Sequence, residues 1–121
     1  MARVLIVDDS PSQLLVLKRI VEGLGHETIS AEDGQQGVEM ARQNLPDLIL
    51  MDVVMPNLNG FQATRTISRD KATSHIPVIL VTTKDQETDR VWGMRQGAKG
   101  YITKPINEGQ LVKVIKEFLP G

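Results

Sequence analysis

Apolar and polar positions form alternating blocks along this chain, and the blocks predict strands and helices in turn. Three runs are continuously apolar, VLIV at 4–7, LILM at 48–51 and IPVILV at 76–81. Continuous apolarity over this length is typical of strands buried on both faces of a parallel sheet. Two more polar runs, HETIS at 26–30 and GYITK at 100–104, are expected at or near the sheet edges.

Helical periodicity fills the intervals between these runs. The first helix is expected to begin at Ser10, because Pro11 and Gln13 complete a capping box, and to stop at Gly25. The other helices are expected over residues 34–44, 60–69 and 86–96, and after the cap Asn107. The fourth of these helices carries Val91 and Met94. The predicted inward-facing side chains are Leu14, Leu17, Val21, Leu24, Val38, Ala41, Leu45, Phe61, Thr64, Ile67, Leu111, Val114, Ile115 and Phe118.

Five successive strand–helix units predict an α/β fold with a parallel sheet, right-handed crossovers and helices on both faces. The weak second and fifth strands fit a doubly wound, flavodoxin-like sheet of order 2-1-3-4-5, flanked by five helices. A length of 121 residues predicts a single domain over residues 1–121 with no output domain.

Composition narrows the function classes. The net charge is −1 and 24% of residues are charged, which gives no basic field for nucleic acid. The chain has no cysteine, so disulfides, thiolate zinc sites and thiol catalysis are excluded. No signal peptide precedes the first strand, and no apolar run approaches the roughly 20 residues that cross a bilayer. We therefore expect a cytoplasmic domain that neither enters membranes nor binds nucleic acid.

Polar side chains gather where the predicted strands end, at the edge where parallel α/β sheets bind ligands. They are Asp8, Asp9, Asp52, Thr82, Thr83 and Lys104. Two carboxylates about 4 Å apart repel by roughly 4 kcal/mol at an effective dielectric near 20. Lys104 and a divalent cation can offset this repulsion, and oxygen ligands without His or Cys favour Mg²⁺ or Mn²⁺.

A carboxylate beside Mg²⁺ can attack phosphorus and form an acyl phosphate. Asp52 is the best candidate nucleophile because it stands alone after the central strand. Asp8 and Asp9 then act as metal ligands, while Lys104 and the Thr82 hydroxyl each take a phosphoryl oxygen.

These residues resemble those of a known family. VDDS after the first strand, LMDVVMPNLNG after the third, VTT after the fourth and KP after the fifth resemble the CheY-like receiver domains of bacterial response regulators. The resemblance covers the chain from Ala2 to about Leu119. It implies a signalling protein that takes a phosphoryl group from a histidine kinase and catalyses only its own phosphorylation and dephosphorylation.

The resemblance also implies the role of each residue. Asp52 is the phosphoacceptor, and Asp8, Asp9, Asp52 and the Val54 carbonyl hold the metal. Thr82 and Tyr101 form the switch, Lys104 binds the phosphoryl group, and Lys104–Pro105 is a cis peptide. Phosphorylation is expected to turn Tyr101 inward and to change the surface of helix four, strand five and helix five. On that surface Arg90, Trp92 and Arg95 are candidate contacts for a downstream partner.

Some positions depart from the common family pattern. Thr83 stands where alanine or glycine is usual, and Val54 and Lys84 flank the position of the attacking water. The stretches NGFQATR and VTTKDQETDRVWGMRQGA resemble the single-domain receivers of the type IV pilus chemosensory system. This resemblance implies a role in twitching motility, with a downstream motility or signalling protein as partner and a monomer or weak phosphorylation-linked dimer as assembly.

Other functions fit parts of the pattern. The chain could be a phosphate sink for a competing receiver or an unphosphorylated scaffold. A haloacid-dehalogenase-like Mg²⁺ phosphohydrolase also uses Asp, Thr and Lys, but such enzymes have a D-x-D pair after the first strand. A flavin or nucleotide protein would need a glycine-rich phosphate loop that the sequence lacks.

Overall fold

The computed structural model of the protein describes residues 1–120. Five parallel strands form one sheet in the order β2-β1-β3-β4-β5, as predicted. The more polar strands lie at the two edges. The strands are β1 (Arg3–Val7), β2 (Glu27–Ala31), β3 (Leu48–Met51), β4 (Val78–Thr82) and β5 (Gly100–Thr103).

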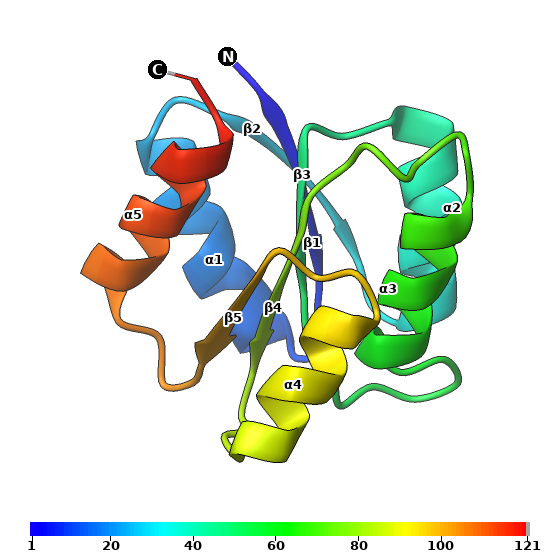
Figure 1. Cartoon of the computed structure of the whole chain (residues 1–121). Coiled ribbons are helices and arrows are strands. Elements are labelled where there is room, and N and C mark those ends of the chain that lie inside the picture. Colours follow the sequence, from blue (N-terminus) through cyan, green and yellow to red (C-terminus); the bar gives the residue numbers. More distant parts are fainter. Residues whose placement is uncertain (121) are drawn as a thin grey trace.

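Helices cover both faces of the sheet (Figure 1). They are α1 (Pro11–Gly23), α2 (Gly34–Asn44), α3 (Gly60–Arg69), α4 (Glu87–Arg95) and α5 (Glu108–Phe118). α1 and α5 pack on one face, where Leu17 and Leu111 join a buried cluster with Ile6 and Ile79. α2, α3 and α4 cover the other face. Within residues 1–120 no helix has both the length and the apolarity needed to cross a membrane.

Local signals fix most helix ends as expected. The Ser10 hydroxyl accepts a hydrogen bond from the Gln13 amide at the start of α1, and Asn107 caps α5 in the same way. The second bond of the capping box expected at Ser10 is not formed, because the Ser10 amide donates to Asp8 Oδ1. Gly25 and Gly97, with φ of 90° and 110°, follow α1 and α4 in the left-handed conformation that glycine adopts without strain.

Two expectations are wrong, one about a strand boundary and one about a buried side chain. Strand β4 begins at Val78 rather than Ile76, because Pro77 has no N–H and the Ile76 amide donates to Thr73 in a turn. β4 also extends one residue beyond the apolar run, so Thr82 is its last residue and pairs with Thr103 of β5. Leu45 was expected to face inward but is 51% exposed, since α2 ends at Asn44 and Leu45 turns the chain with a φ of 45°.

Candidate functional site

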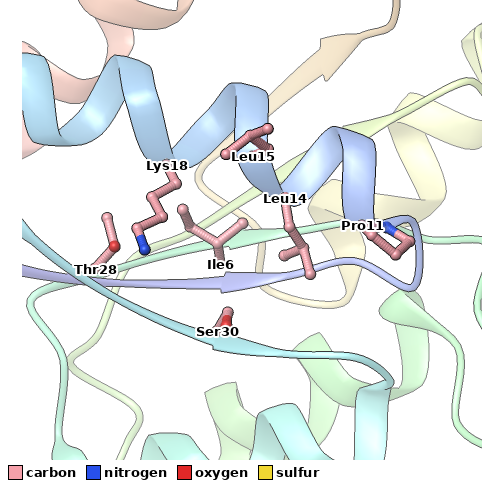
Figure 2. A pocket seen from close by; sticks show the side chains of 7 residues that line it. All are labelled: Ile6, Pro11, Leu14, Leu15, Lys18, Thr28 and Ser30. Carbon is pink, nitrogen blue, oxygen red and sulfur yellow. The ribbon is translucent and has the colours of Figure 1, made fainter.

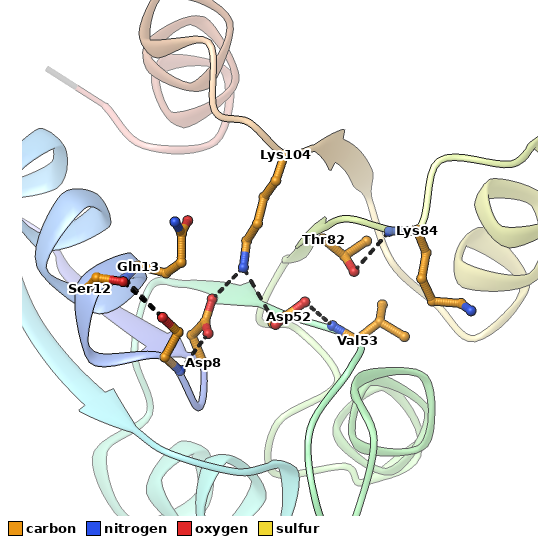
Figure 3. Close-up of polar contacts among 9 residues, drawn as sticks. Asp8, Ser12, Gln13, Asp52, Val53, Thr82, Lys84 and Lys104 are labelled. Carbon is orange, nitrogen blue, oxygen red and sulfur yellow. Dashed lines mark hydrogen bonds and ion pairs between the residues drawn. The ribbon is translucent and has the colours of Figure 1, made fainter.

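Lys104 joins two buried carboxylates at the carboxyl edge of the sheet (Figure 3). Its Nζ lies 2.7 Å from Asp8 Oδ2 and 3.5 Å from Asp52 Oδ2. The three side chains come from the ends of β1, β3 and β5, so the strand order itself brings them together. Their side chains are at most 9% exposed, and water screens their charges poorly.

The second oxygen of each buried carboxylate accepts a backbone hydrogen bond. Asp52 Oδ1 accepts from the Val53 amide at 2.7 Å, and Asp8 Oδ1 accepts from the Ser10 amide at 2.9 Å. These bonds hold both carboxylates in fixed orientations. Sequence reasoning missed them, because no side-chain pattern reports where a backbone amide points.

Asp52 is unfavourably charged in this setting. Burial raises the pKa of Asp52 above its ordinary value of 3.8, the nearby Lys104 ammonium lowers it, and the Asp8 carboxylate raises it again. Hydrogen bonds from the Val53 amide and the Thr82 hydroxyl favour the charged form, but burial prevails. One lysine therefore does not fully compensate the negative charge at this edge.

The residues fit a hard divalent cation. Asp8, Asp9 and Asp52 each present a carboxylate oxygen, and these oxygens lie within 4.8 Å of one another. Asp8 and Asp52 are buried while Asp9 is exposed, so the acidic group opens to solvent on one side. An all-oxygen donor set of this kind suits Mg²⁺ with some of its water ligands retained.

The loop after β3 is held by close contact between its backbone and the backbone at the start of α3. The Gly60 amide donates to the Val53 carbonyl at 2.9 Å, and a Cβ at Gly60 would overlap the Asp52 carbonyl oxygen. Val54 lies in this loop with its side chain 57% exposed. Glycine at the start of α3 is thus needed to hold Asp52 in place.

The predicted switch residues occupy the neighbouring strands. Thr82 is fully buried, and its Oγ1 accepts from the Lys84 amide at 3.3 Å. Tyr101 already lies inward in this structure, since the residue is 6% exposed and its hydroxyl donates to the Lys84 carbonyl at 2.6 Å. The expected effect of phosphorylation on its position stays a prediction. The Arg90 guanidinium lies over this ring, 5.7 Å from its centroid.

α4 exposes apolar side chains. Val91, Trp92 and Met94 are 43–48% exposed, because α4 contacts the sheet through Gly93, beside Leu80 and Tyr101. Arg90 and Arg95 are exposed on the same helix.

The Lys104–Pro105 peptide is cis, as expected. His26 is buried, with its Nδ1 accepting from the Ala2 amide, and His75 is exposed, so neither lies with the carboxylates.

The model of the response regulator receiver domain matches residues 4–116. The chain is a response regulator receiver domain. It is 59% identical to Protein PilH of Pseudomonas aeruginosa over 121 residues, which cover all of both chains. The receiver fold accounts for the sheet order and for the acidic edge described above.

Solved receiver structures have the same fold. Chemotaxis protein CheY4 of Vibrio cholerae superposes with a TM-score of 0.91 at 30% identity, covering 98% of this chain and 99% of that one. The receiver domain of sensor histidine kinase PA1611 from Pseudomonas aeruginosa superposes with a TM-score of 0.89 at 29% identity, covering 97% and 96%. That structure has a magnesium ion coordinated in its active-site cleft.

Proposed function

We propose that this receiver domain accepts a phosphoryl group on Asp52 from a phosphohistidine of a histidine kinase, with Mg²⁺ as cofactor. The observation that carries the proposal is the position of Asp52. Its buried carboxylate lies beside Lys104 and within reach of Asp8 and Asp9, at the carboxyl end of the sheet. A solitary structural aspartate would need no such group of charges around it.

The two oxygens of the Asp52 carboxylate have different contacts. The Val53 amide holds Oδ1, while Oδ2 faces Lys104. A carboxylate oxygen attacks phosphorus, the new O–P bond forms, and the P–N bond to the kinase imidazole breaks. The departing nitrogen keeps the electron pair. Lys104 and the Thr82 hydroxyl then each contact a phosphoryl oxygen.

The acidic group would hold the cation through Asp8, Asp9, Asp52 and the Val54 carbonyl. When bound, Mg²⁺ neutralises phosphoryl oxygens and orients the group for in-line transfer. Asp8 and Asp52 already share Lys104 at 2.7 and 3.5 Å, so this lysine supplies part of the same neutralisation.

The signal leaves the site through Thr82. When its hydroxyl moves toward the phosphoryl group, it gives up the Lys84 amide, and Lys84 also carries the carbonyl bound by Tyr101. The β4–α4 loop thus connects the acceptor to the surface of α4, β5 and α5, where Arg90, Trp92 and Arg95 contact a downstream protein. The change is a population shift that the phosphoryl group drives by its differential contacts.

The process served is the control of type IV pilus twitching motility, in the cytoplasm. Full-length similarity to PilH supports this assignment. The kinase and the downstream motility protein are the partners.

Intact-mass spectrometry tests the acceptor directly. The protein is incubated with a small acyl phosphate or phosphoramidate and Mg²⁺, as wild type, Asp52→Asn and Asp85→Asn. We expect one added phosphoryl group in wild type and in Asp85→Asn, an exposed aspartate at the same edge, and none in Asp52→Asn or with chelator. An adduct on Asp52→Asn would assign the acceptor to another carboxylate.

A further inference from the structure

The outer edge of β2 presents backbone groups that no other part of residues 1–120 binds. β2 pairs only with β1. The Glu27 amide donates to the Ala2 carbonyl, and the Ala31 carbonyl accepts from the Asp8 amide, so the odd residues of β2 face β1. Because the backbone alternates along a strand, the N–H and C=O groups of Thr28 and Ser30 point outward.

β2 carries neither lysine nor proline at this edge, and the Thr28 hydroxyl donates to Glu22 Oε2 of α1 at 2.7 Å. Natural edge strands commonly use lysine, proline or bulges to prevent pairing with another chain. The sequence of β2, ETISA, contains no lysine and no proline. Its one charged residue, Glu27, is the first of the strand, and its Oε2 lies 3.4 Å from Arg3 Nε.

Apolar surface flanks the edge on both faces of the sheet. On one face, the side chains of Thr28 and Ser30 line a groove of about 270 Å³ along α1, where Leu15 is 48% exposed (Figure 2). On the other face, Ile29 and Met40 are only partly buried. A partner that bound the edge would also cover these side chains.

We propose that the occupant is a second copy of this chain, paired antiparallel with β2 about a two-fold axis through Ile29. In this register Thr28 lies opposite Ser30 of the second copy, and each such pair exchanges two hydrogen bonds. Every outward N–H and C=O of Thr28 and Ser30 is then satisfied. Glu27 lies opposite Ala31, so no like charges face each other across the strands.

The helices fit this arrangement. α1 and α2 each contact both β1 and β2, so each lies over the boundary between these strands. Across the new seam, a helix and its copy are two strand spacings apart, about 9–10 Å. Packed helices have this same separation. The groove beside Leu15 would be closed by α1 of the second copy. Lys18 lines the groove, and Glu22 lies beside it where its carboxylate accepts from the Thr28 hydroxyl, so both signs of charge are present.

Cysteine cross-linking tests the register, since the chain has no cysteine of its own. Ile29→Cys places two thiols opposite each other with Cα atoms about 4.5 Å apart, within disulfide range. Glu27→Cys is the matched control on the same strand and face, because its two copies would be four residues apart along the seam, roughly 13 Å. We expect Ile29→Cys to form covalent dimers at least about tenfold faster under mild oxidation. Equal rates would overturn the proposal.

Sedimentation equilibrium of the full chain tests the association without cross-links. Ser30→Pro removes an N–H that has no partner in the monomer, and Ser30→Thr keeps it. We expect a concentration-dependent dimer for wild type and Ser30→Thr and a monomer for Ser30→Pro, with circular dichroism showing all three folded. A wild type that stays monomeric, or a dimer unchanged by Ser30→Pro, would refute the interface. Neither result depends on phosphorylation of Asp52.

Discussion

At the scale of single residues, Asp52 combines reactivity with an energetic cost. Burial and the Asp8 carboxylate raise the pKa of Asp52, and Lys104 offsets this only in part. In the proposed transfer the ionised group attacks phosphorus, so the folded protein keeps a charge that opposes its own stability. A cation or a phosphoryl group that enters this edge meets ligands already oriented by backbone amides.

Replacing Asp52 should therefore stabilise the metal-free protein. Because the folded pKa of Asp52 is above 3.8, the charge costs stability as pH rises through that folded value. In Asp52→Asn, the Asn Oδ1 can still accept the hydrogen bond from the Val53 amide, and Lys104 still forms its ion pair with Asp8. We expect the melting temperature at neutral pH with chelator to rise by about 4 °C, which corresponds to an increase of about 1 kcal/mol in the free energy of unfolding. The gain should shrink as pH falls toward 3.8, and a lower melting temperature at neutral pH would contradict this account.

Replacing Lys104 should have the opposite effect. Lys104→Met leaves Asp8 and Asp52 buried without their counter-charge, and removing one partner of a buried pair costs about 3–5 kcal/mol. Urea denaturation should show a loss of about 3 kcal/mol that Mg²⁺ partly restores. Lys99→Met, at an exposed lysine just before β5, is the control and should change stability by less than about 0.5 kcal/mol.

The single tyrosine permits a direct optical titration. Burial and the nearby Asp89 carboxylate raise the pKa of Tyr101 to about 12, from 10.0, against the lowering effect of Arg90. The ultraviolet absorbance of tyrosinate should therefore rise near pH 12 in the folded protein and near 10 in concentrated urea. The contribution of Tyr101 to stability is complete below pH 10 and is lost as pH rises through 12. A folded-state midpoint near 10 would show that the ring is not held inward.

At the scale of elements, the start of α3 and the end of β3 form one unit. A methyl group at Gly60 would meet the Asp52 carbonyl and the Val53 Cα. α3 can lie against the backbone of Asp52 only because Gly60 has no side chain.

Two alanine substitutions separate this contact from general helix propensity. Gly60→Ala should destabilise by more than about 2 kcal/mol and slow phosphorylation, because the backbone of Asp52 must move. Gly23→Ala, at the end of α1 with no atom within 4 Å of the new Cβ, should be neutral or stabilising by up to about 1 kcal/mol. Chemical denaturation of both variants checks the difference, and equal effects would contradict it.

Sequence predicted the elements well where a local rule governed them. Four-residue apolar runs gave β1 and β3 almost to the residue, and caps such as Ser10 and Asn107 gave helix starts. Prediction was wrong where the outcome depends on packing. The left-handed turn at Leu45 overrode the helical period and left this side chain half exposed.

The site shows the same division. Asp8, Asp52 and Lys104 each follow directly after a strand-forming run, and this spacing alone is enough to predict that they meet at one edge of the sheet. Distances and backbone partners, such as the amides of Ser10 and Val53, follow from tertiary geometry and could not be predicted from spacing.

At the scale of the whole molecule, ligand binding and stability are coupled. The acidic residues come from strands at the centre of the sheet, so a cation that holds them opposes global unfolding. Mg²⁺ at 100 times its dissociation constant should add about 2.7 kcal/mol to the free energy of unfolding. Thermal melts should show this for wild type, and a much smaller effect for Asp9→Asn. An equal shift with NaCl at matched ionic strength would mean that screening, not a site, is responsible.

The place of Trp92 has a practical consequence. It is the only tryptophan in the chain, and half of it is exposed on α4, close along the helix to the arginine that covers Tyr101. Its fluorescence will therefore respond to movement of α4 and to contact with a partner. When tryptophan is excited selectively, no other residue of the chain contributes to this emission. The protein therefore carries its own fluorescent label on the surface proposed to contact a downstream partner, and kinetics can be followed without attaching a dye.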